Sequence, residues 1–153
     1  MNMGMLSEEC KNVARVVSGI LADTYILYMK TQNFHWNVTG PLFFQLHTLF
    51  EKQYNELAEA VDELAERIRA LGEPAPAAYT VYMKLSSLQE ELGVPSSELM
   101  VAQLLEDHET IVRHLRESFD VIDQAGDEAT ADLFTQRLAY HEKTAWMLRA
   151  MID

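Results

Sequence analysis

Apolar residues recur at intervals of three and four along most of the chain, the spacing that places side chains on one face of an α-helix. The first such series runs from Val13 to Thr31. Ser7 and the two acidic residues that follow it are typical of the start of a helix. We therefore expect a first helix of about 25 to 28 residues with Ser7 as its cap.

The second helical series is predicted to be the longest. Pro41 suits the first position of a helix, the apolar series ends at Leu71, and Gly72 is a common residue just past a helix end. This helix would be about 46 Å long at the usual rise. Residues 72–95 hold three of the four prolines and only a short helical pattern near 79–90. We expect them to form a long connection across the side of the domain.

Two further helical series follow this connection. One begins near Ser96 and stops at Ala125–Gly126, and the other begins near Asp127 and continues almost to the last residue. No run of alternating β-branched residues indicates a strand. The pattern therefore predicts an all-α fold, a four-helix bundle with a long crossover between the second and third helices that contains a short helix. A single domain, residues 1–153, accounts for the chain.

Composition and charge limit the kinds of function that we expect for this chain. The chain carries 24 Asp and Glu against 12 Lys and Arg, so its net charge is −12 and it should attract cations and repel nucleic acid and anionic membranes. The single cysteine, Cys10, has no internal partner for a disulfide. No secretory leader and no unbroken run of 18 apolar residues is found. We expect a soluble, cytoplasmic protein without a membrane partner.

A row of polar residues lies beside the apolar stripe of the second helix. His47, Glu51, Asp62 and Glu66 each follow an expected stripe position by one residue, a rotation of about 100 degrees. They should therefore face a flank that another surface can cover, not the centre of the bundle. His35 lies twelve residues before His47, just ahead of a predicted turn, so it can fold back beside His47.

The spacing of this row excludes a metal site closed by one helix. Residues four apart can bind the same ion, but Glu51 and Asp62 are separated by about 16 Å of helix axis. If two copies of the helix pack antiparallel about a two-fold axis, facing positions have residue numbers with a constant sum. The pairs 47 with 66 and 51 with 62 have the same sum. Two half-sites from different chains would then complete one site, twice per dimer.

Two imidazoles and three carboxylates suit Fe(II), Zn(II) or Mn(II), and redox use favours iron. The Glu-x-x-His pairs of di-iron bundles are absent, because none of the five histidines has a glutamate three residues before it. His108 and His141 lie on or near apolar stripes, so we interpret them as core histidines. The alternative interpretation of the polar row is a solvated helix face with two incidental histidines.

The segment H-W-N-V-T-G, the second histidine twelve residues after the first and the acids at 51, 62 and 66 resemble the Dps family, the mini-ferritins. The likeness extends from about residue 10 to 152. It implies a ferritin-like bundle, a hollow dodecameric shell and ferroxidase sites shared across two-fold interfaces, with one or two irons in each. One chain would supply His35, His47 and Glu51, and its partner Asp62 and Glu66. Many members carry Asp where this chain has Glu51.

The resemblance also implies roles for residues outside this set. Trp36 matches the family tryptophan and would supply or quench an electron during iron oxidation. Asp127, Glu128 and Asp132 are most simply the cap and first-turn acids of the last helix. In the family shells this region surrounds a three-fold pore, so these acids are also candidates for a carboxylate ring that attracts Fe(II).

The expected function is iron storage and detoxification, with Fe(II) oxidised by hydrogen peroxide and kept as a ferric mineral in the shell. Two alternatives are a stress protein that binds nucleoid DNA with little iron chemistry and a helical interaction module without chemistry. Many Dps proteins bind DNA through a lysine-rich tail, whereas only Lys11 and Arg15 are basic near this N-terminus. Direct DNA binding is therefore not expected.

Overall fold

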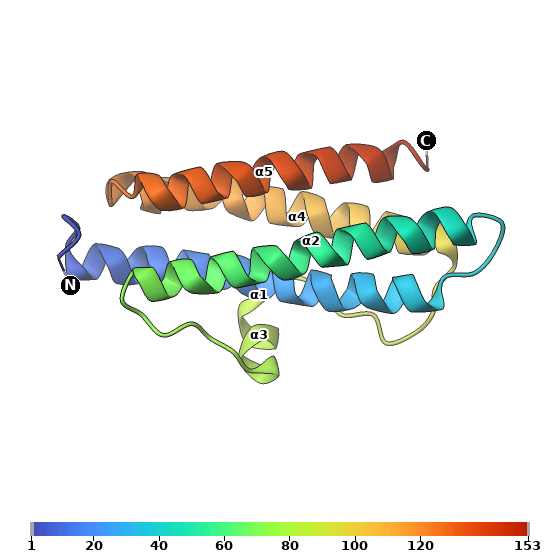
Figure 1. Cartoon of the computed structure of the whole chain (residues 1–153), viewed down its shortest axis with the longest axis horizontal. Helices are drawn as coiled ribbons and strands as arrows, with labels where there is room; N and C mark the ends of the chain where they lie inside the picture. Colours follow the sequence, from blue (N-terminus) through green and yellow to red (C-terminus); the bar gives the residue numbers. More distant parts are fainter. Residues whose placement is uncertain (1, 153) are drawn as a thin grey trace.

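Four long helices pack side by side in the computed structural model, which describes residues 2–152, and a short helix lies outside them (Figure 1). No strand occurs among these residues. The predicted all-α bundle is confirmed. Its helices are α1 (Ser7–Asn37), α2 (Phe43–Ala70), α3 (Tyr79–Leu85), α4 (Ser97–Gln124) and α5 (Glu128–Arg149).

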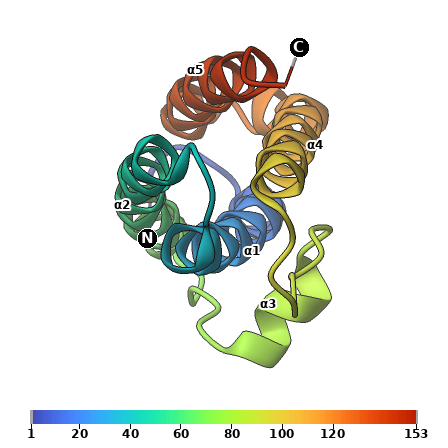
Figure 2. The same cartoon turned by 90° about the vertical axis from the view of Figure 1, so that its right-hand side faces the viewer.

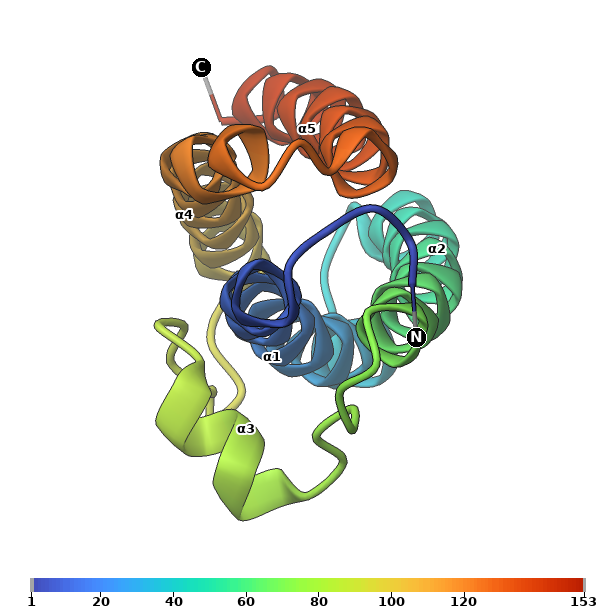
Figure 3. The same cartoon turned by 90° about the vertical axis from the view of Figure 1, so that its left-hand side faces the viewer.

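The four long helices occupy the corners of a square when the bundle is viewed along its axis (Figures 2 and 3). The chain reverses between α1 and α2 and again between α4 and α5. The crossover between α2 and α4 runs the length of the bundle along α1, with α3 at its middle (Figure 1). The predicted crossover with a short helix is confirmed, although α3 covers only part of the helical pattern expected near 79–90.

Glycines end two of the long helices as predicted. Gly72 has a φ of 91°, its N–H donates to the Arg69 carbonyl, and the N–H of Glu73 donates to the Ile68 carbonyl at 3.3 Å. These bonds form a Schellman motif, which needs a left-handed residue after the helix and therefore favours glycine. Gly126, with a φ of 63°, ends α4 in the same way.

The helix starts differ in detail from the predictions. Ser7 is the first residue of α1 and not its cap, so that prediction was wrong. The capping bond is made by Glu9, whose carboxylate accepts from the Leu6 N–H at 2.8 Å. The helix has 31 residues, more than expected, because it continues past Thr31 to Asn37 and buries Phe34. It is longer than α2, which has 28 residues, so the prediction that the second helix is the longest was wrong. Pro41 lies in the turn before α2, which begins at Phe43, so its assignment to the first helical position was wrong.

The core follows the predicted apolar faces. In α2 the stripe residues are buried except Val61, which is half-buried, and the polar Gln53 is buried among them. No helix within residues 2–152 combines the length and apolar character needed to cross a bilayer. The largest fully buried side chains include Phe34, Phe50, Phe134, Leu21, Leu27, Leu57 and Leu64.

Candidate metal centre

His35 and His47 stack against each other where α1 and α2 meet. Their ring centroids are 3.9 Å apart and the rings are 15° from parallel. His35 lies in the last turn of α1 and is 6% exposed, and His47 lies in the second turn of α2 and is half-buried. The prediction that His35 folds back beside His47 is confirmed.

Reciprocal hydrogen bonds fix the protonation of the two rings. The Nδ1 of His35 donates to the His47 carbonyl at 2.8 Å, and the Nδ1 of His47 donates to the His35 carbonyl at 2.8 Å. A carbonyl oxygen only accepts, so each Nδ1 carries a proton. In the neutral rings each Nε2 is therefore left with its lone pair, the form in which imidazole binds a metal ion.

Aromatic neighbours hold this histidine pair in place. Tyr54 of α2 meets the His35 ring edge-on, with ring centroids 5.1 Å apart. Phe43, the first residue of α2, stacks on the other face of the pair at 5.1 Å from His47. The rings are thus fixed by packing and by backbone hydrogen bonds, an arrangement that prepares ligands before a metal binds.

The three predicted acidic ligands lie exposed along α2. Glu51, Asp62 and Glu66 make no hydrogen bond or ion pair with any described residue, so their carboxylates are available to a ligand. No cluster of three or more His, Cys, Asp or Glu side chains in residues 2–152 is arranged to hold a metal ion. The helix keeps the two halves of the predicted set apart, as its spacing indicated.

Trp36 faces a different side of α1 from the histidine pair. Its side chain is 66% exposed and lines an open pocket of about 250 Å³ together with Met29, Asn33 and Glu91. This pocket lies between α1 and the crossover, and none of its lining residues belongs to the predicted ligand set. A redox role for Trp36 stays a prediction.

Asp127 is a buried helix cap. It is 4% exposed, accepts from the Thr130 N–H at 3.0 Å and pairs with Arg67 of α2 at 2.7 Å. Although burial opposes ionisation, the hydrogen bonds from Arg67 and Thr130 hold the pKa of Asp127 below its usual value. Its oxygens are thus occupied within the chain. Glu128 and Asp132 are exposed, and they are the two members of the predicted pore set with carboxylates facing solvent.

A second histidine pair lies inside the bundle, at the depth where di-iron proteins place their metals. The Nδ1 atoms of His108 and His141 are 2.8 Å apart, and Arg137 donates to the Nε2 of His141 at 3.1 Å. Arg137 also pairs with Glu56 across the α2–α5 contact. Since the Nε2 of His141 accepts, its Nδ1–H donates to His108, whose own proton is then on Nε2.

This internal network is structural. Burial lowers the pKa of His108 to about 3 and that of His141 well below its usual value, with the nearby Arg137 guanidinium adding to both effects. A permanent positive charge against neutral imidazoles opposes a metal cation at this position. The interpretation of His108 and His141 as core histidines is confirmed by their complete burial.

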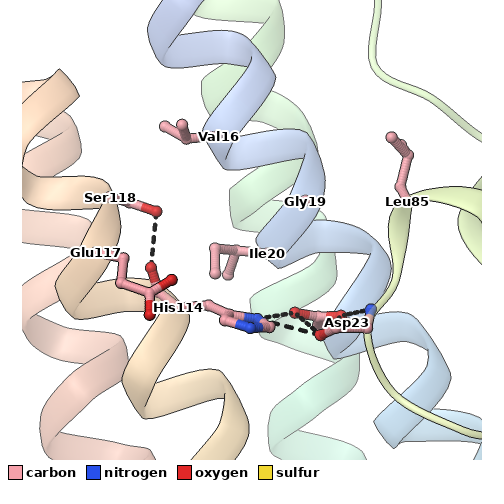
Figure 4. Close-up of a pocket in the computed structure, with 9 residues that line it drawn as sticks. Val16, Gly19, Ile20, Asp23, Leu85, His114, Glu117 and Ser118 are labelled. Carbon is pink, nitrogen blue, oxygen red and sulfur yellow. Dashed lines mark hydrogen bonds and ion pairs between the residues drawn. The ribbon is translucent and has the colours of Figure 1, made fainter.

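One polar cluster was not singled out in the sequence. Asp23 of α1, 2% exposed, accepts from the Nδ1 of His114 at 3.0 Å (Figure 4). It also accepts from the Ser86 Oγ and the Ser87 N–H, each at 2.8 Å. The Oγ of Ser87 lies 3.1 Å from the same Nδ1. A catalytic triad needs serine and acid on opposite ring nitrogens. The cluster therefore lacks a triad's geometry and ties the crossover to α1 and α4, beside a pocket of about 320 Å³.

Comparisons with known proteins agree with the fold. A sequence model described as a ferritin-like domain matches residues 18–153. "DNA protection during starvation protein 2" of Bacillus anthracis is 39% identical over 143 residues, which cover 94% of this chain and 98% of that protein. A low temperature-induced protein of Nostoc sp. is 41% identical over 99% of this chain and 86% of its own length.

Solved structures place the chain in the same group. A Dps protein from Bacillus brevis has a TM-score of 0.93 and 38% identity, over 97% of this chain and 100% of that one. The Dps protein from Vibrio cholerae O1, described as one of the ferritin-like diiron-carboxylate proteins, has a TM-score of 0.96 and 28% identity, over 100% and 96%. The chain therefore belongs to the ferritin-like family and, within it, to the Dps mini-ferritins.

Proposed function

We propose that the protein oxidises Fe(II) with hydrogen peroxide and stores the ferric product inside a dodecameric shell of identical chains. Membership of the ferritin-like family supports iron storage in general. The finer proposal is carried by the His35–His47 pair. Two imidazoles present bare Nε2 atoms on a chain whose described residues place no third ligand beside them. This supports a half-site that a second copy of the chain would complete.

The second copy would supply Asp62 and Glu66 to the histidine pair and to Glu51. An antiparallel two-fold packing of α2 brings these positions together, because their spacing along the helix is symmetric. Apolar side chains around the α1–α2 turn support a covered surface here. Leu42, Phe43 and Phe44, at the start of α2, are 48%, 44% and 74% exposed. Large apolar groups gathered on one face of a soluble chain mark an interaction surface.

The ligand set favours oxidation of bound iron. Neutral imidazole nitrogens accept Fe(II), whereas carboxylates bind the harder Fe(III) more strongly. Gathering three carboxylates around the ion would therefore lower the Fe(III)/Fe(II) potential. Two imidazoles and three carboxylates are enough ligands to bind one or two irons. Glu128 and Asp132, exposed at the start of α5, are the candidates for a carboxylate ring that concentrates Fe(II).

A complementation experiment tests the shared site. One variant carries His35→Ala and His47→Ala, and the other carries Asp62→Ala and Glu66→Ala. Each alone lacks half of every site and should lose rapid peroxide-dependent Fe(II) oxidation. When the two are refolded together at equal amounts, about a quarter of the sites combine intact histidines with intact carboxylates. We expect a corresponding share of the wild-type rate to return.

The control is each variant refolded with itself under the same conditions. Native mass spectrometry establishes that the mixed particles contain both chains. Mixed particles that are no more active than the separate variants would mean that sites are not shared between chains. A wild-type protein that forms no shell and leaves Fe(II) unoxidised would contradict the function as a whole.

A further inference from the structure

Five of the chain's six tyrosines form one continuous series of ring contacts that begins at the histidine pair. Tyr54 of α2 contacts His35, with ring centroids 5.1 Å apart. Tyr54 also contacts Tyr28 of α1 at 6.1 Å, and Tyr28 contacts Tyr25 at 5.9 Å. The series thus follows α1 away from the candidate metal centre, toward the middle of the bundle.

The series ends on α3, which packs against α1 outside the bundle (Figures 1 and 2). Tyr25 contacts Tyr82 at 4.8 Å and Tyr79 at 6.3 Å, again between ring centroids. All these distances lie in the range where aromatic rings touch. Tyr82 is 6% exposed, whereas Tyr79 is 67% exposed and lines a surface pocket of about 210 Å³. A predicted metal ligand is thus connected to an exposed phenol.

Packing alone does not require tyrosine at each of these positions. Phenylalanine fills nearly the same space without a hydroxyl group that must be desolvated or hydrogen-bonded. Some hydroxyls do have partners: Tyr82 donates to the Pro76 carbonyl at 2.6 Å, and Tyr28 accepts from Gln32 at 3.0 Å. What distinguishes a phenol chemically is that it gives up one electron together with its proton, whereas the phenylalanine ring does not do so readily.

We infer that this tyrosine series is an electron relay, which supplies an electron to the candidate metal centre and moves the resulting radical to Tyr79. The inference rests on the proposed function, in which hydrogen peroxide oxidises Fe(II). Peroxide takes two electrons when its O–O bond breaks, and one Fe(II) gives only one. With Tyr54 as second donor, Fe(II), H₂O₂ and the phenol yield Fe(III), hydroxide, water and a tyrosyl radical. The phenolic proton is the one that converts the second hydroxide to water.

Each later step exchanges a hydrogen atom between neighbours. The Tyr54 radical takes an electron and a proton from Tyr28, and Tyr28 takes them from Tyr25, so charge is conserved at every contact. The relay removes the radical from the metal ligands and prevents release of hydroxyl radical from a site that holds a single iron. Trp36, in contrast, makes no ring contact with the series and lines a pocket near the crossover.

The test interrupts the series without removing a ring. Tyr28→Phe breaks it at its middle, and Tyr140→Phe, at the one tyrosine outside the series, is the matched control. Assembled protein with less than one Fe(II) per chain is mixed with hydrogen peroxide and frozen for electron paramagnetic resonance. Parallel samples are digested to locate oxidised tyrosine and histidine by mass spectrometry. In wild type and in Tyr140→Phe we expect oxidised products at Tyr25 and Tyr79.

In Tyr28→Phe these distal products should fall to the background of iron-free protein, while oxidation at Tyr54 and His35 rises. Fe(III) formation is recorded on the same samples. If Fe(II) is not oxidised in the wild type, both the proposed function and the relay are overturned. If Fe(II) is oxidised but Tyr25 and Tyr79 are modified equally in Tyr28→Phe and in the control, the relay alone is overturned and the tyrosines serve only as packing.

Discussion

The protonation of single histidine rings is the property from which the proposed site follows. His35 and His47 each donate from Nδ1 to a backbone carbonyl of the other, so their tautomers are set by the chain itself before any metal arrives. A histidine in solution divides its proton between the two nitrogens, and binding a metal to Nε2 then requires that nitrogen to be bare. Fixing the tautomer removes this cost of rearrangement.

We predict that this tautomer is present in the iron-free protein. Long-range proton–nitrogen correlation spectra at neutral pH should show protonated Nδ1 and bare Nε2 for His35 and His47. His114 is a useful internal reference, because its Nδ1 also donates, to Asp23. Signals from a protonated Nε2 in the neutral rings of the pair would contradict the assignment and remove the main support for a half-site.

The internal pair His108–His141 predicts how stability depends on pH. An unfolded histidine has a pKa near 6.5, whereas burial lowers that of folded His108 to about 3. As the pH falls below about 6.5, the unfolded chain binds protons that the folded chain does not, so the folded state loses stability until the pH approaches 3. The loss at pH 5 should be about 2 kcal/mol from His108, and His141 shifts in the same direction.

Denaturant unfolding at pH 7.5 and pH 5, at one protein concentration, measures this difference. A variant with His108→Leu and His141→Met lacks the two titrating groups and should show a flatter pH profile. Its absolute stability can change in either direction, because Arg137 loses a partner, so the slope with pH is the quantity to compare. Parallel profiles for wild type and variant would show that the pair does not titrate as proposed.

At the scale of helices, the two acidic residues Asp127 and Asp132 near the start of α5 have different structural roles. Asp127 caps the helix and pairs with Arg67, so Asp127→Ala should destabilise the folded chain by about 2–4 kcal/mol. Asp132 is exposed and bonds only to Gln136 one turn later. Asp132→Ala should change stability by no more than about 0.5 kcal/mol. Thermal unfolding of both variants makes the comparison, and equal losses would contradict the assignment.

Much of this element-level picture was accessible from sequence, because it depends on local chemistry. Apolar periodicity located the four long helices, and Gly72 marked a helix end through its left-handed backbone. The predicted role of Asp127 as a helix cap was incomplete. Asp127 also pairs with Arg67, which is sixty residues away in the sequence, so a local pattern could not reveal the contact. The start of α2 was misplaced because Pro41 suits a turn as well as a first helical residue.

The candidate site was partly predictable for the same reason. Spacing along one helix indicated that the ligands form two separated halves and that His35 returns beside His47. The reciprocal carbonyl bonds were not predictable, because they depend on how closely α1 and α2 approach. The tyrosine series was missed, since its members lie on three helices and share no spacing that a single-helix pattern would reveal.

At the scale of the whole molecule, charge sets which partners the chain can meet. A net charge of −12 on each chain is multiplied in any shell, producing a field that attracts Fe(II) and repels polyanions. Relatives at 39% identity carry names that refer to DNA protection. Protection of DNA by removal of iron and peroxide requires no contact with DNA, so those names are compatible with a protein that does not bind it.

We therefore predict that the assembled protein does not retard duplex DNA at neutral pH and physiological salt, about 0.15 M. Affinity for DNA depends on releasing counterions by placing several Lys or Arg side chains against phosphates, and here acids outnumber basic residues two to one.

A gel-shift titration in the presence of a chelator excludes bridging by divalent ions, and the same titration with added magnesium shows how much bridging contributes. A variant in which the exposed Asn2, Met3 and Glu8 are changed to Lys is the positive comparison, because it adds basic charge near the N-terminus and leaves the capping Glu9 in place. Retardation of DNA by the unmodified protein in chelator, weakening steeply as salt is raised, would show that a basic surface forms on assembly despite the charge of the chain, and would restore nucleoid binding as its function.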